Sequence, residues 1–86
     1  MPSYLVETYL PRERAGECLA RESRARSAAD ALARVRFEHS IYIPEDEICF
    51  FVFAARSGRD VALAAQRAAL DPFRVVEAIP SRREEQ

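Results

Sequence analysis

Two apolar segments, residues 35–43 and 48–54, flank the acidic turn 44–47 and constrain the fold more than any other part of the chain. Both segments are rich in β-branched and aromatic residues, and a proline opens the turn between them, so together they predict a β-hairpin. The second segment is apolar at every position, a pattern typical of a strand that is covered on both faces. We therefore expect helices on one face of the sheet and a second subunit on the other.

Two further strands are predicted near the ends of the chain. Residues 3–10 alternate in polarity and stop at Pro11, and residues 73–79 form a short, mainly apolar run directly after Pro72. Residues 1–80 are interpreted as one domain, and residues 81–86 as a solvated tail.

Two helices are predicted between these strands. Residues 14–34 lack proline and are rich in alanine, and a second helix is predicted to begin with Ser57 as its N-cap and Asp60 in the capping-box position. Because the residue before a proline is pushed out of the helical region, Asp71 and Pro72 should end this helix. The first helix carries a narrow apolar stripe at helical spacing: Ala15, Cys18, Leu19, Ala25, Ala29, Leu32 and Ala33.

The predicted order is strand, helix, strand, strand, helix, strand within about 80 residues. This order is typical of the ferredoxin-like α+β fold, βαββαβ, with a four-stranded antiparallel sheet in the order 4-1-3-2. Right-handed crossovers place both helices on one face of such a sheet. The opposite face has no helix of its own and is called the open face below.

Strand alternation assigns residues to the two faces. The side of residues 35–43 predicted to face the helices carries Val35, Phe37, His39, Ile41 and Ile43. The polar residues predicted on the open face are Glu7, Glu38, Ser40, Tyr42 and Glu77. The apolar residues expected around them are Leu5, Tyr9, Val75 and Ile79. Such a patch is larger than monomers usually expose, so we expect a homodimer. A bulge in any strand would reverse part of this assignment.

Composition and charge exclude several classes of function. The 86 residues include 13 basic and 14 acidic side chains with a net charge of −1, and no basic patch typical of nucleic-acid binding is evident. No apolar run approaches the roughly 20 residues of a membrane helix, and no signal peptide is recognised, so we expect a cytoplasmic protein without membrane partners. Cys18 and Cys49 fit no disulfide framework or zinc motif and are interpreted as reduced thiols.

The blocks at 44–50 (PEDEICF) and 72–78 (PFRVVEA), together with the opening PSYLVETYLP, resemble a family of small bacterial ferredoxin-like proteins. The family is catalogued as a domain of unknown function, and one branch is described as nickel-binding. The resemblance extends from residue 2 to about residue 79 and implies a homodimer with nickel at its surface. Two departures are the phenylalanine at position 53, where a glutamate is frequent in the family, and the lack of a glycine at 68–70.

Metal binding is the first function to consider, with nickel or another divalent ion as the cofactor. His39 is the sole imidazole, the commonest nitrogen ligand for such ions, and Glu45, Asp46 and Glu47 could add carboxylate oxygens. The competing interpretations are a buried or interface histidine and a solvated turn, since consecutive residues of a tight turn rarely converge on one ion.

The alternative is a dimeric α+β barrel module that binds or transforms a small organic molecule in a cavity on the open face. Its candidate pocket residues are Glu7, Tyr9, Glu38, Tyr42 and Glu77, where a carboxylate could act as acid or base if burial raised its pKa. Pairing of the three glutamates with Arg36 or Arg74 is the simpler interpretation. The sequence contains no Ser-His-Asp order, glycine-rich phosphate loop or paired-histidine motif, so nucleophilic catalysis is not expected.

Overall fold

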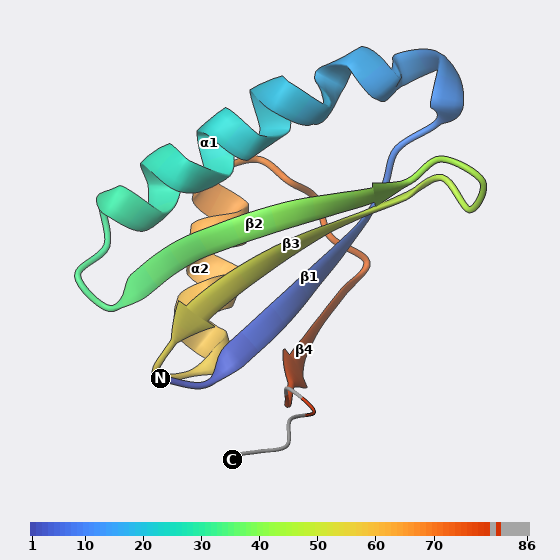
Figure 1. Ribbon diagram of the computed structural model, residues 1–86. Helices are drawn as coiled ribbons and strands as arrows, with labels where there is room; N and C mark the ends of the chain where they lie inside the picture. Colours follow the sequence, from blue (N-terminus) through green and yellow to red (C-terminus); the bar gives the residue numbers. More distant parts are fainter. Residues whose placement is uncertain (80, 82–86) are drawn as a thin grey trace.

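The computed structural model describes residues 1–79 and 81 and has the predicted order of elements (Figure 1). The elements are β1 (Ser3–Tyr9), the 3-10 helix η1 (Arg12–Glu17), α1 (Cys18–Asp30), β2 (Val35–Ile43), β3 (Ile48–Ala55), α2 (Gly58–Arg67) and β4 (Arg74–Ala78). The antiparallel strands lie in the order β2-β3-β1-β4, and both helices cover one face. The ferredoxin-like α+β prediction is therefore confirmed.

The first helical region differs from its prediction at both ends. It opens as η1, in which Arg14 has non-helical backbone angles, and α1 then ends at Asp30, four residues before the predicted end. Residues 31–34 are needed to turn the chain back into β2, so closure of the sheet overrides the helical propensity of these alanine-rich residues. Within the described residues, no helix has the length and hydropathy needed to cross a membrane.

The second helix begins as predicted and ends early. Ser57 Oγ accepts a hydrogen bond of 3.2 Å from the backbone N–H of Asp60, which confirms the N-cap. The helix ends at Arg67, not at Asp71, because the N–H groups of Ala69 and Leu70 bond back to the carbonyls of Gln66 and Ala65. This pair of bonds is a Schellman motif, and it places Ala69 in the left-handed region with φ of 56°.

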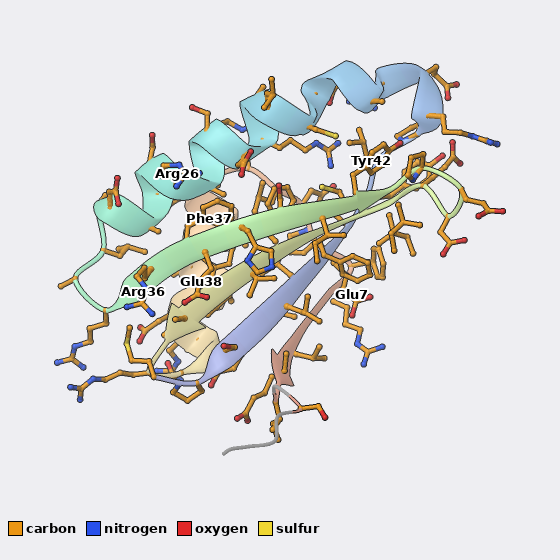
Figure 2. The ribbon with its side chains drawn as sticks, in the orientation of Figure 1. Glu7, Arg26, Arg36, Phe37, Glu38 and Tyr42 are labelled. Atoms are coloured by element: carbon orange, nitrogen blue, oxygen red, sulfur yellow. The ribbon has the colours of Figure 1, made fainter. Side chains whose placement is uncertain are left out.

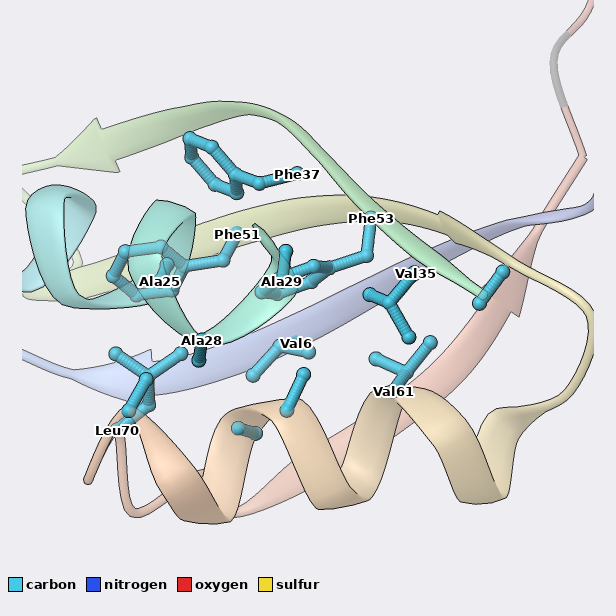
Figure 3. Close-up of a cluster of buried hydrophobic side chains, with 14 of the residues drawn as sticks. Val6, Ala25, Ala28, Ala29, Val35, Phe37, Phe51, Phe53, Val61 and Leu70 are labelled. Atoms are coloured by element: carbon cyan, nitrogen blue, oxygen red, sulfur yellow. The ribbon is translucent and has the colours of Figure 1, made fainter. Parts of the chain in front are cut away.

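The core lies between the sheet and the two helices (Figure 3). Phe37, Phe51 and Phe53 supply most of its volume from the sheet, and the helices meet them with small residues, so the helices can approach the sheet closely. The buried residues of α1 are Arg21, Ala25, Ala28 and Ala29. Leu19, predicted to lie in this stripe, is 77% exposed instead.

A β-bulge at Glu38 corrects the predicted faces of β2. Phe37 lies opposite Phe53, but His39 lies opposite Val52, so Glu38 is an extra residue without a partner. Side chains beyond the bulge change face, which places His39, Ile41 and Ile43 on the open face and Ser40 and Tyr42 on the helix side. Figure 2 shows Phe37 and Tyr42 toward α1 and η1, and Arg36 and Glu38 away from them.

The register of β4 corrects a second assignment. Val75 lies opposite Val6 and Glu77 opposite Tyr4, so both face the helices and not the open face as predicted. Val76, opposite Leu5, takes the place expected for Val75. A shift of one residue in register moves every side chain of a strand to the other face, which alternation within β4 alone does not reveal. Of the predicted tail, 81–86, all but Ser81 lies outside the described residues.

Candidate binding surface on the open sheet face

The strand registers assemble two adjacent rows of side chains on the open face. Residues directly opposite each other in an antiparallel sheet share a face, so each row can be followed across all four strands. The first row is His39, Val52, Leu5 and Val76, and the second is Ile41, Phe50, Glu7 and Arg74. The centre of the face is thus apolar, with an imidazole at the β2 edge and an ion pair toward the β4 edge.

The apolar residues of these rows are incompletely covered. Leu5, Phe50, Val52 and Val76 are half-buried, whereas Val6, Phe51 and Phe53 on the opposite face are fully buried, and Ile41 is 46% exposed. Ile43 and Ile48 extend the patch toward the hairpin. In the part of the chain that the structure describes, both helices lie on the other side of the sheet. Contiguous apolar surface of this kind marks interaction sites in soluble proteins.

Glu7 is a charged side chain within this apolar surface. It lies opposite Phe50 on one side and Arg74 on the other, and its side chain is 14% exposed. Its carboxylate Oε2 is 3.4 Å from Nε of Arg74, which is itself largely exposed. The ion pair holds a carboxylate in place beside the apolar patch, where it can accept hydrogen bonds from a bound group.

His39 lies on β2 at the edge of the open face and is exposed. A role as a core histidine is therefore excluded, and an interface or ligand role stays open. Its change of face is a consequence of the bulge, so strand alternation placed it on the wrong side.

The acidic residues of the hairpin lie away from His39. Ile43 is four positions after His39, a distance of about 13 Å along a strand, and the turn lies beyond Ile43. Glu45 and Asp46 are exposed at this turn. Within residues 1–79 and 81, no three His, Cys, Asp or Glu side chains form a group able to hold a metal ion.

Glu47 has structural contacts of its own. Its Oε2 accepts a hydrogen bond of 2.8 Å from the backbone N–H of Arg12, and its Oε1 accepts one of 3.4 Å from the Tyr9 hydroxyl. These bonds tie the hairpin to the start of η1. The nearby negative charge of Glu47 is the main cause that raises the pKa of Tyr9, which therefore stays protonated. Tyr9 is a neutral donor at the margin of the open face.

The predicted pocket residues are divided between the two faces. Glu7 and Tyr9 lie on the open face as predicted, and Tyr42 and Glu77 lie on the helix side. Glu38 is the bulge residue, and its Oε2 accepts a hydrogen bond of 3.0 Å from Arg36. The expected pairing of these glutamates with Arg36 or Arg74 is confirmed for Glu7 and Glu38. The sequence interpretation missed His39, Phe50 and Val76 as members of this surface, and only the strand registers could have identified them.

These features define a ferredoxin-like α+β domain with one mainly apolar sheet face that neither of the described helices covers. No family model matches the chain, and no curated protein matches it. Among solved structures, the chain is similar to the crystal structure of SCO4226 from Streptomyces coelicolor A3(2), with a TM-score of 0.73 and 16% sequence identity. The match covers 92% of this chain and 98% of that chain, and at this identity it shows the fold.

Proposed function

We propose that the protein is a homodimeric binding module whose two open sheet faces pack against each other and hold a small organic molecule between them. The observation that carries the proposal is the continuous row of His39, Val52, Leu5 and Val76 at the centre of a four-stranded sheet, which no described helix of the chain covers. A second copy of the chain is a suitable cover because a two-fold pairing places the same apolar rows on both sides.

The size of the face supports this pairing. Four strands about 4.8 Å apart and about seven residues long make a face of roughly 20 by 23 Å, or about 450 Å². Two such faces cover about 900 Å² in projection, and the side chains that stand up from the sheet add to this area. The pair therefore approaches the roughly 1,000 Å² at which specific interfaces begin.

The few polar groups on the surface support an organic ligand. Small-molecule sites combine an apolar lining with a small number of fixed polar groups. Here Phe50, Leu5 and Val52 would supply the lining, and the carboxylate of Glu7, held by Arg74, would orient the ligand. Twisted sheets diverge toward their corners when they pack face to face, which leaves space between them.

The assembly is tested by light scattering at micromolar concentration with a matched pair of variants. Leu5→Arg places a charge in the centre of the open face, and Leu63→Arg places the same charge on the exposed side of α2. The wild type and Leu63→Arg should be dimers, and Leu5→Arg should be a folded monomer. A monomeric wild type, or a Leu5→Arg variant that remains dimeric, would contradict the proposal.

The ligand role is tested with the neutral fluorescent probe N-phenyl-1-naphthylamine. The dimer should bind this probe saturably, and Leu5→Arg should lose the binding because the enclosed apolar space is lost. If the protein is a dimer but does not enhance the fluorescence of the probe, the proposed dimer stands and the proposed ligand cavity is wrong.

Divalent-metal binding is the second candidate, favoured by the exposed position of His39 on the same face. A dimer would bring two imidazoles to one assembly, although one imidazole per chain cannot build a closed four-ligand site. Calorimetric titration with nickel separates the candidates. Weak binding that His39→Ala removes, and that exposed Asp46→Asn leaves unchanged, supports a metal site at His39. The absence of heat for nickel, zinc and cobalt would leave the organic ligand as the remaining proposal.

A further inference from the structure

We propose that a cavity lined by three arginines, formed by η1, α1 and the loop after α2, binds the oxyanionic group of a small molecule, a phosphate or a carboxylate. The cavity has a volume of about 320 Å³, and its charged lining residues are Arg14, Glu17, Arg21, Arg24 and Asp71. Three guanidinium groups against two carboxylates leave the lining with a net positive charge. The inference is independent of the open sheet face.

Arg21 is the buried member of this cluster. The residue is 9% exposed, and its Nη1 donates hydrogen bonds of 3.2 Å to Thr8 Oγ1 and 3.1 Å to the carbonyl oxygen of Tyr9. Thr8 Oγ1 itself donates to the carbonyl oxygen of Cys49 at 3.0 Å, so its lone pairs are directed at Arg21. The buried end of β1 thus fixes one side of the guanidinium.

The other side of Arg21 faces a weaker partner. Its Nη2 is 3.6 Å from Oε1 of Glu17, beyond the usual length of a hydrogen bond between charged groups. A guanidinium carries five N–H donors, so a buried arginine is most stable when acceptors surround the whole fork. An oxyanion that enters the cavity could bond to Nη2 directly.

Glu17 occupies the position that such an anion would take. Its two oxygens accept hydrogen bonds of 2.6 and 3.1 Å from Nε and Nη2 of Arg14, a bidentate arrangement. These hydrogen bonds lower the pKa of Glu17, which therefore stays ionised. The carboxylate lies between Arg14 and Arg21, which shows that the two guanidinium groups can share one oxyanion.

Arg24 supplies a third, partly anchored guanidinium. Its Nε donates a hydrogen bond of 2.8 Å to the carbonyl oxygen of Ala68 at the end of α2, which leaves both Nη groups as donors. Planar guanidinium forks match the geometry of phosphate and carboxylate oxygens. We expect Glu17 to compete with the ligand for Arg14 and Arg21, and Arg24 to bind the ligand without such competition.

The experiment is an NMR titration of the full ¹⁵N-labelled chain with inorganic phosphate and, separately, with acetate, at constant ionic strength and pH. Saturable shifts are expected in residues 14–24 and 69–71. Arg24→Gln should weaken the binding several-fold, and Glu17→Gln should strengthen it several-fold by removing the competing charge. The matched control is Arg59→Gln, which removes an exposed arginine of α2 outside the cavity and should leave the affinity unchanged.

The amide spectrum of each variant reports whether the fold is intact, and Leu5→Arg should bind the anion as the parent does because Leu5 does not line the cavity. Tighter binding of phosphate assigns a phosphate ligand, and tighter binding of acetate assigns a carboxylate. Shifts that do not saturate, an equal loss of affinity in Arg24→Gln and Arg59→Gln, or weaker binding by Glu17→Gln would overturn the inference.

Discussion

The hydroxyl of Tyr42 donates a hydrogen bond of 2.9 Å to the carbonyl oxygen of Leu10, and this contact joins β2 to the segment that follows β1. It exists only because the bulge at Glu38 turns Tyr42 to the helix side of the sheet, where its ring packs against the core. The same bulge places His39 on the open face. One extra residue in β2 therefore decides both a structural contact and the composition of the candidate site.

Tyr42→Phe should lower the free energy of unfolding by about 1 kcal/mol. The reason is that a half-buried hydrogen bond is lost and the Leu10 carbonyl is left without its partner. Tyr9→Phe is the matched control. Its hydroxyl makes a longer bond of 3.4 Å to Glu47 at an exposed position, so its effect should be smaller. Urea denaturation measures the free energy of unfolding of both variants, and equal losses would show that the Tyr42 bond stabilises the protein no more than the Tyr9 bond does.

Thr8→Val should destabilise the protein by roughly 2 kcal/mol, since it removes the link between two buried groups. The side chains have similar shapes, but valine can neither accept from Arg21 nor donate to the carbonyl of Cys49. Urea denaturation measures the loss. A loss below the error of the measurement would mean that water replaces the hydroxyl.

Ala69→Gly should stabilise the protein by about 1 kcal/mol, because Ala69 has a φ of 56° and only glycine adopts this region without strain. Ala62→Gly is the opposite control, since Ala62 lies in the exposed interior of α2 and should lose about 1 kcal/mol. Thermal unfolding of both variants gives the comparison. If both glycines destabilise, the strain at Ala69 is relieved elsewhere in the motif.

Stability should fall as the pH rises from about 8.5 toward the pKa of Cys49, which burial raises to about 11. The thiol ionises at a lower pH in the unfolded chain than in the folded protein. The contribution of the protonated thiol to the free energy of unfolding is therefore fully present below the unfolded pKa and is lost as pH rises through the folded pKa. Burial also raises the pKa of Tyr42, which acts in the same direction.

Urea denaturation at neutral pH and at about pH 10.5 measures this loss. The decline should be smaller in Cys49→Ala than in the wild type. Cys18→Ala keeps Cys49 but removes a neighbour that also raises its pKa, so its decline should lie between those of the wild type and Cys49→Ala. An equally steep decline in Cys49→Ala would assign the effect to other groups.

Much of the candidate site was beyond prediction from the sequence. Glu7 and Tyr9 were placed on the open face correctly, because β1 alternates without interruption. The predicted faces of His39, Tyr42 and Glu77 are wrong. A bulge in β2 and the register of β4 decide which face of the sheet each of these side chains lies on. The buried guanidinium of Arg21 was missed, because the residues that bond to it lie on another element.

The sequence by itself determined the order and type of the elements. Alternation, alanine content, the hairpin turn and the Ser57 cap are local features, and the free energies they reflect depend on residues within a few positions of each other. The tertiary structure alone decided which side chains share a face and which charges meet. Strand register depends on hydrogen bonds between strands that lie far apart in the sequence, and no local pattern in a single strand contains that pairing.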